Sequence, residues 1–150
     1  MKKIICLLLA LMLVLAGCSQ APVTKDIAAI KDTIVSQLEI ENALDLPAQR
    51  LLDLYGIEAT QIKASACFIT MGGAFPDEIV MVEATDAAAA KAVAQKLEAR
   101  LADVKNQAQN YDAESYALLE KCKVTTLGTY VTLFISAKSE AMQSIFDSAK

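Results

Sequence analysis

The residues with the clearest chemical potential lie near the start of the chain, where Cys18 follows an apolar run. Two lysines follow Met1, and residues 4–15 are uninterruptedly apolar. This stretch is shorter than the roughly 20 residues that a membrane-spanning helix needs, and it has the order of a secretory signal. Ala16 and Gly17 are small enough for a signal peptidase pocket, and the Cys18 thiol is a nucleophile that can accept a diacylglycerol through a thioether. The pattern predicts a cleaved and lipidated N-terminus.

The run Leu15-Ala16-Gly17-Cys18 resembles the lipobox of bacterial lipoproteins. We therefore expect residues 1–17 to be a signal peptide, residues 18–25 to be the lipidated cysteine with a short tether, and residues 26–150 to form the folded part. Two acyl chains anchor stably, whereas one binds marginally. The expected location is the cell membrane, lipid-anchored on the extracytoplasmic face. The alternative is a buried N-terminal helix with a chance cysteine.

The charge of the chain excludes some classes of partner. Without Lys2 and Lys3, 12 basic residues face 18 acidic ones, a formal charge of −6. Nucleic-acid backbones are recognised by clustered Lys and Arg, so we expect no nucleic-acid partner. The expected partners are the membrane, through lipidated Cys18, and a protein of the cell envelope.

Cys67 and Cys122 remain once Cys6 is removed with the signal peptide and Cys18 is acylated. A disulfide between them can persist outside the cytoplasm; it closes a loop of about 55 residues and is nominally worth about 4 kcal/mol. The other interpretation is two separate, half-buried cysteines acting as small hydrophobes. The chain has no histidine and no paired-cysteine spacing, so no metal site and no cofactor are expected.

Hydrophobic periodicity predicts helices and strands in two similar blocks. A first amphipathic helix is expected over about residues 26–43. The first block then reads helix, strand, strand, helix over about 47–109, and the second repeats this order over about 111–150. This weak pseudo-repeat predicts a single α+β domain with an antiparallel sheet of about four strands and with helices packed mainly on one face.

These elements resemble the bacterial lipoprotein family known as domain of unknown function 4358. The resemblance covers most of the chain from about residue 29 onward, and its motifs are packing and turn motifs. It implies a lipid-anchored extracytoplasmic domain and brings no catalytic residues. The motifs are Leu51–Ile57 (Leu-Leu-Asp-Leu-Tyr-Gly-Ile), Glu78–Val82, Arg100, Asn110-Tyr111 and Gly128-Thr129-Tyr130-Val131.

The chain offers no recognisable catalytic constellation. A nucleophile with a general base usually includes histidine, which is absent. Asp77 and Glu78 are adjacent at the start of a predicted strand, so their side chains point to opposite faces, and we interpret them as two solvated acids. Gly72-Gly73 joins strand to strand without a helix N-terminus, which indicates a hairpin connection and not a phosphate cradle.

Two groups of apolar residues are candidate partner contacts. Phe75 and Pro76 lie at the tip of a glycine-containing loop, where they either contact a partner or cap the sheet edge. Tyr130 and Phe134, with Cys67 and Ile69, are expected on the sheet face away from the main core. Either the N-terminal helix covers that face or it stays exposed as an apolar interaction patch.

Three classes of function follow. The favoured hypothesis is a non-enzymatic binding or protein-interaction module held at the membrane. The alternative is a small-ligand-binding lipoprotein with a pocket between the long helix and the sheet, where the alanines around Ala90 leave room. An enzyme with carboxylate or serine–lysine chemistry is the third, and we expect the chain not to be an enzyme.

Overall fold

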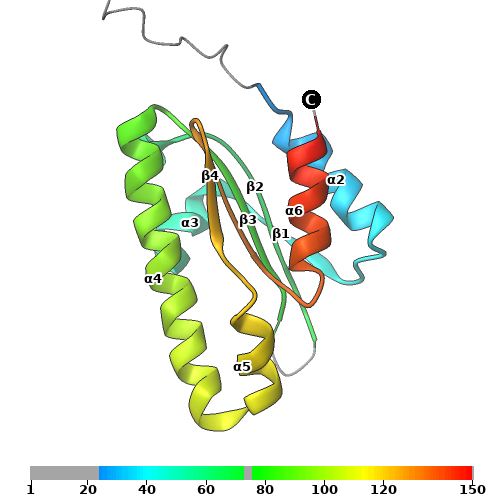
Figure 1. Ribbon diagram of the computed structural model, residues 1–150. Helices are drawn as coiled ribbons and strands as arrows, with labels where there is room; N and C mark the ends of the chain where they lie inside the picture. The colour runs from blue at the N-terminus through cyan, green and yellow to red at the C-terminus, as the bar shows by residue number, and fades with distance from the viewer. Residues whose placement is uncertain (1–23, 73–75, 150) are drawn as a thin grey trace, which may run out of the picture.

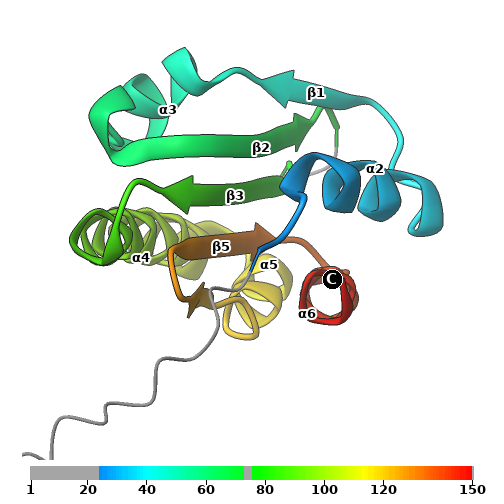
Figure 2. The same ribbon diagram turned by 90° about the horizontal axis from the view of Figure 1, so that it is seen from above.

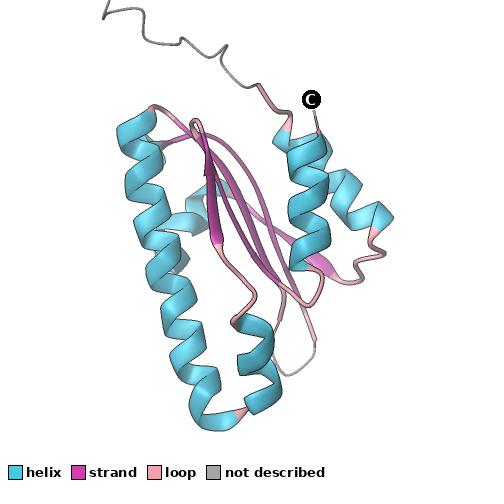
Figure 3. Ribbon diagram, in the orientation of Figure 1, coloured by secondary structure: helices cyan, strands magenta, loops and turns pink. Residues whose placement is uncertain are grey.

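The computed structural model describes residues 24–72 and 76–149, which form one antiparallel sheet with five α-helices and one short 3-10 helix around it (Figure 1). In chain order the elements are α2 (Ile27–Gln37), β1 (Ala43–Leu46), α3 (Ala48–Tyr55), the short 3-10 helix η2 (Ala59–Gln61), β2 (Ile62–Thr70), β3 (Glu78–Ala84), α4 (Ala87–Tyr111), α5 (Ala113–Leu119), β4 (Val124–Leu127), β5 (Tyr130–Ile135) and α6 (Ser139–Ser148). Figure 3 shows these classes of element along the chain.

The sheet has five strands in the order β1-β2-β3-β5-β4, and every neighbouring pair is antiparallel. The expected α+β class, single domain and antiparallel sheet are confirmed. The additional strand is β1, which begins at residue 43, where the first helix was expected to end. Four residues carry too little periodicity to reveal a strand, and β1 owes its conformation to pairing with β2.

Helices cover both faces of the sheet, whereas they were expected mainly on one face (Figure 2). α3, α4 and α5 pack on one face, and α2 and α6 pack on the other. The central strand β3 supplies both cores, because Val80 and Val82 point to the first face while Ile79 and Met81 point to the second. An uninterrupted apolar run in a strand indicates burial on both sides.

Two helix ends carry residues that are typical of caps. Asp86 caps α4, and its carboxylate accepts a hydrogen bond from the Ala89 N–H at 2.8 Å. Gly56 ends α3 in the left-handed conformation with φ +68°, which favours glycine. The helix–strand–strand–helix order also recurs, as α3-β2-β3-α4 and α5-β4-β5-α6. The closing helices α4 and α6 nevertheless lie on opposite faces of the sheet.

Candidate functional site

A polar cluster of Tyr55, Glu78 and Arg100 lies where α3 and α4 meet the start of β3. The Tyr55 hydroxyl donates to Glu78 Oε2 at 3.3 Å, and Arg100 Nε donates to the same oxygen at 3.1 Å. Arg100 Nη2 donates to the other carboxylate oxygen and forms an ion pair with it. Glu78 is 7% exposed. Three segments on which the family resemblance rests therefore converge on one buried carboxylate.

The fold explains why these side chains meet. Glu78 shares the alternation of Val80 and therefore points to the face that α4 covers. Arg100 lies one turn from Leu97 and beside Leu101, at the flank of the buried stripe of α4. The interpretation of Glu78 as a solvated acid was wrong, because a partner 22 residues away neutralises it.

Burial and the Glu78 carboxylate together set the electrostatics of the cluster. Burial is the largest cause that raises the pKa of the Tyr55 hydroxyl, and the Glu78 carboxylate adds to the rise. The hydrogen bond to Glu78 is the largest cause that raises the pKa of Arg100. Both carboxylate oxygens already accept hydrogen bonds, and five hollows on the described part of the chain are lined by other residues. The arrangement suits a brace between helices and sheet better than a reacting group.

A second polar cluster fixes the point where the chain enters the domain. The Lys25 backbone N–H donates to the Tyr130 hydroxyl at 3.0 Å. The Lys25 Nζ donates to the carbonyls of Phe146 at 2.9 Å and of Ala149 at 2.6 Å, and it lies 5.1 Å from the centroid of the Phe146 ring. A cation at the carbonyl end of a helix is favoured by the helix dipole. Lys25 thus joins the entry of the chain to the end of α6.

The same device recurs at the other end of this helix pair. Lys138, at the start of α6, donates from Nζ to the Leu38 carbonyl at the end of α2 at 2.6 Å. α2 and α6 are therefore antiparallel, and a lysine before each one reaches the last carbonyls of the other. We call the end of the sheet beside Lys25 and Tyr130 the entry end, and the end where Glu78 pairs with Ile135 the far end.

The candidate contact residues occupy different environments. Tyr130 and Phe134 are 2% and 3% exposed beneath α2 and α6, so they are not accessible to a partner, which corrects that expectation. The expected covering of this face by the N-terminal helix is confirmed. Pro76 is exposed, while Phe75 lies outside the described residues.

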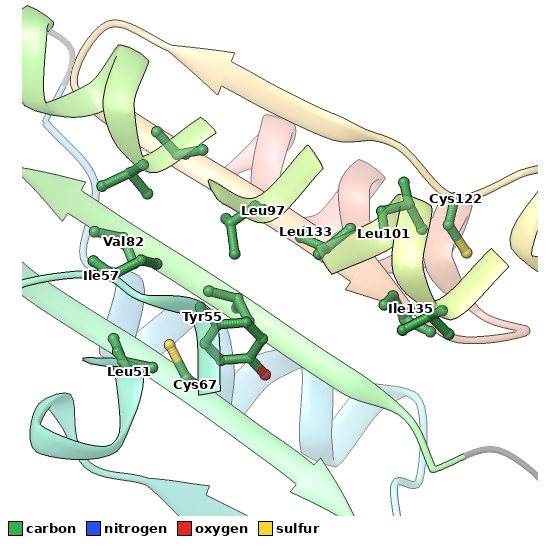
Figure 4. Close-up of a cluster of buried hydrophobic side chains, with 14 of the residues drawn as sticks. Leu51, Tyr55, Ile57, Cys67, Val82, Leu97, Leu101, Cys122, Leu133 and Ile135 are labelled. Atoms are coloured by element: carbon green, nitrogen blue, oxygen red, sulfur yellow. The ribbon is translucent and has the colours of Figure 1, made fainter. Parts of the chain in front are cut away.

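The cysteines also take different positions. Cys67 and Cys122 are buried free thiols, and both belong to the core on the α4 face (Figure 4). The interpretation of two separate cysteines therefore holds, although both are fully buried and Cys67 lies on the face opposite to Tyr130. Desolvation raises the pKa of the Cys67 thiol to about 12. Cys18 lies outside the described residues.

The space expected for a small ligand is filled by side chains. Ala90 and Val93 are 1% and 0% exposed and pack against the sheet. Neither lines any of the five hollows mentioned above. Within residues 24–72 and 76–149, no three His, Cys, Asp or Glu side chains are grouped to hold a metal ion. None of the helices described there is long and apolar enough to cross a membrane.

Comparison with known proteins identifies the family of the chain. The family model described as Domain of unknown function (DUF4358) matches residues 36–136. The match covers about two thirds of the chain, from the end of α2 through β5, and the chain belongs to this family. Comparison with curated proteins and with solved structures gave no match.

Proposed function

We propose that this member of the DUF4358 family is a lipid-anchored extracytoplasmic domain that works as a non-enzymatic protein-interaction module. The observation that carries the proposal is the order of residues ahead of Cys18: positive charge, short apolar run, two small residues and a thiol. No internal feature of a folded domain requires this order. A signal peptidase and an acyl transferase do require it.

The entry of the chain supports anchoring at close range. Seven residues, Ser19–Lys25, follow Cys18. The last of them, Lys25, is bound to the folded domain through Tyr130 and the carbonyls at the end of α6, contacts that we call the Lys25 clamp. Such a tether spans at most about 25 Å when fully extended. The strands run between the entry end and the far end, so a domain held through Lys25 directs its far end away from the lipid. That end is the part most accessible to another protein.

The buried polar groups favour interaction over catalysis. Tyr55 and Arg100 donate hydrogen bonds to both oxygens of the Glu78 carboxylate. None of the three residues lines any of the five hollows mentioned above. Catalysis needs a group with a free lone pair or proton within reach of a substrate. The chemistry of this domain therefore favours a rigid body that presents surfaces.

Metabolic labelling with radioactive palmitate tests the anchor on the full chain expressed in a bacterial host. Cys18→Ser is expected to abolish incorporation and to shift the protein from the detergent phase to the aqueous phase. The matched control is Cys6→Ser, which removes another cysteine of the same leader and leaves labelling intact. Unchanged labelling or unchanged partitioning in Cys18→Ser would refute the anchor.

A further inference from the structure

We infer that the outer edge of β1 is a docking site for an extended, basic segment of a partner protein, which adds to the sheet as a sixth strand. The inference deepens the proposed function, on which it rests, by naming the surface and the chemistry of the partner. β1 is the first strand in the sheet order, and no strand of residues 24–72 or 76–149 pairs with its outer side (Figure 2).

The hydrogen bonds of β2 determine which β1 groups point outward. The Thr70 N–H donates to the Asp77 carbonyl on the β3 side at 3.0 Å. In an antiparallel sheet the backbone N–H and C=O groups of successive residues point alternately to the two neighbouring strands. Phe68, two residues from Thr70, therefore also bonds toward β3, while Cys67 and Ile69 bond toward β1.

The β1 partners of these two residues are Leu44, opposite Ile69, and Leu46, opposite Cys67. Their backbone groups are therefore used within the sheet. The N–H and C=O groups of Ala43 and Asp45 point to the open edge. An exposed edge with free donors and acceptors is the template for strand addition.

Side chains at this edge add an apolar contact. Leu44 is 53% exposed, and Met71, directly after β2, is 66% exposed. Leu44 pairs with Ile69, which is itself partly exposed at the margin of the core. Ile69 and Leu44 form a row of apolar side chains across the two strands, and an incoming strand with an apolar residue opposite Leu44 adds a third member to this row.

The charge around β1 specifies a basic occupant. One open hollow, of about 430 Å³, lies between α2 and β1, and another, of about 320 Å³, lies at the start of β1. Each lysine in their linings already has a partner in its own chain: Lys31 binds Asp45 at 2.8 Å, and Lys138 binds the Leu38 carbonyl. The linings also contain five carboxylates, of which the one that pairs with Lys31 is Asp45; the other four are those of Asp32, Glu39, Glu41 and Asp77.

A second copy of the chain fits this edge poorly. Antiparallel pairing of two β1 strands places a two-fold axis perpendicular to the sheet, which reverses the strand direction of the second copy. Its entry end then lies beside the far end of the first copy, so two short tethers cannot reach one membrane. The copies also bring their carboxylates together. A basic strand from a different protein meets neither obstacle.

The experiment measures binding of a fluorescent octapeptide of alternating valine and lysine to the full chain in detergent, by fluorescence anisotropy. Asp45→Pro removes an outward N–H, and Leu44→Ser removes the apolar contact. Each is expected to weaken binding by about tenfold. Asp45→Asn keeps the N–H and is expected to weaken binding by about two- to threefold.

The matched control is Thr126→Pro in β4, at the opposite edge of the sheet. The Ala84 N–H donates to the Thr129 carbonyl at 2.8 Å, so the next residue, Tyr130, bonds toward β4. The β4 partners of Tyr130 and Thr132 are Leu127 and Thr125, so the N–H of Thr126, which lies between them, points outward. Thr126→Pro is expected to leave the peptide affinity unchanged. A peptide with a central proline, and one with glutamate in place of lysine, are expected not to bind.

Three results would overturn the inference: equal binding by Asp45→Pro and Thr126→Pro, binding of the proline-containing peptide, or self-association of the chain that Leu44→Ser abolishes. Circular dichroism establishes that each variant is folded. If Asp45→Pro fails to fold, Leu44→Ser and Asp45→Asn still test the site. Peptide affinity in detergent does not depend on the lipid, so this test and the palmitate test fail independently.

Discussion

Replacing Arg100 with methionine tests whether the buried Glu78 carboxylate depends on its partner. The change removes two of the three hydrogen bonds that the carboxylate accepts and leaves the one from Tyr55 at 3.3 Å. Methionine retains most of the apolar stem that packs along α4. The loss is therefore mainly that of the charge and its donors.

The magnitude follows from the burial of the two partners. Breaking a buried ion pair by removing one member typically costs about 3–5 kcal/mol. The Glu78 side chain is 9% exposed, but that of Arg100 is 33% exposed, so water can reach the vacated position. We therefore expect the free energy of unfolding to fall by about 2–3 kcal/mol, below the range for a fully buried pair.

Urea unfolding followed by circular dichroism measures the effect, with Glu78→Gln and the double variant completing a mutant cycle. The amide of Glu78→Gln is neutral, so its burial does not require a positive charge from Arg100 to compensate it. The double variant is therefore expected to be more stable than the sum of the single losses predicts, by about 1–2 kcal/mol. Strict additivity, or a loss below about 0.5 kcal/mol in Arg100→Met, contradicts the brace.

Three further predictions concern the remaining core and the entry clamp. Lys25→Met is expected to cost about 1–2 kcal/mol of unfolding free energy in the same assay, because the carbonyls at the end of α6 lose a charged donor; an unchanged urea midpoint would contradict the clamp. Phe134→Ala is expected to lower the free energy of unfolding by about 3–5 kcal/mol, whereas Leu52→Ala, at a position 53% exposed, changes it by less than about 0.5 kcal/mol; similar losses would contradict the burial of Phe134. The folded pKa of Cys67 lies above its ordinary value of 9.0, so its contribution is present below pH 9 and is lost as the pH rises toward 12. In Cys67→Ala, the free energy of unfolding is expected to fall less steeply between pH 9 and pH 12, by up to about 1.4 kcal/mol per pH unit. A slope equal to that of the unsubstituted protein would mean that the thiol is exposed to water.

Local features of the chain were readable because their causes lie within a few residues. The cap at Asp86 depends on a carboxylate three residues before the N–H that it accepts from, and the turn at Gly56 depends on the absence of a Cβ. The order of residues before Cys18 is likewise local, so it predicts an anchor without reference to the fold. Strand alternation also predicted which residues of β5 share a face.

The tertiary structure decided which helix covers which face and which distant groups meet. Periodicity places Tyr130 and Phe134 on one side of β5, but it does not reveal that α2 and α6 bury that side. β1 became a strand through its pairing with β2, and its open edge exists because of its place in the sheet order. Glu78 became a buried, ion-paired carboxylate because α4 packs on its face of the sheet and places Arg100 beside it. Such contacts join residues far apart in the chain, and their free energy depends on packing that no short stretch of sequence contains.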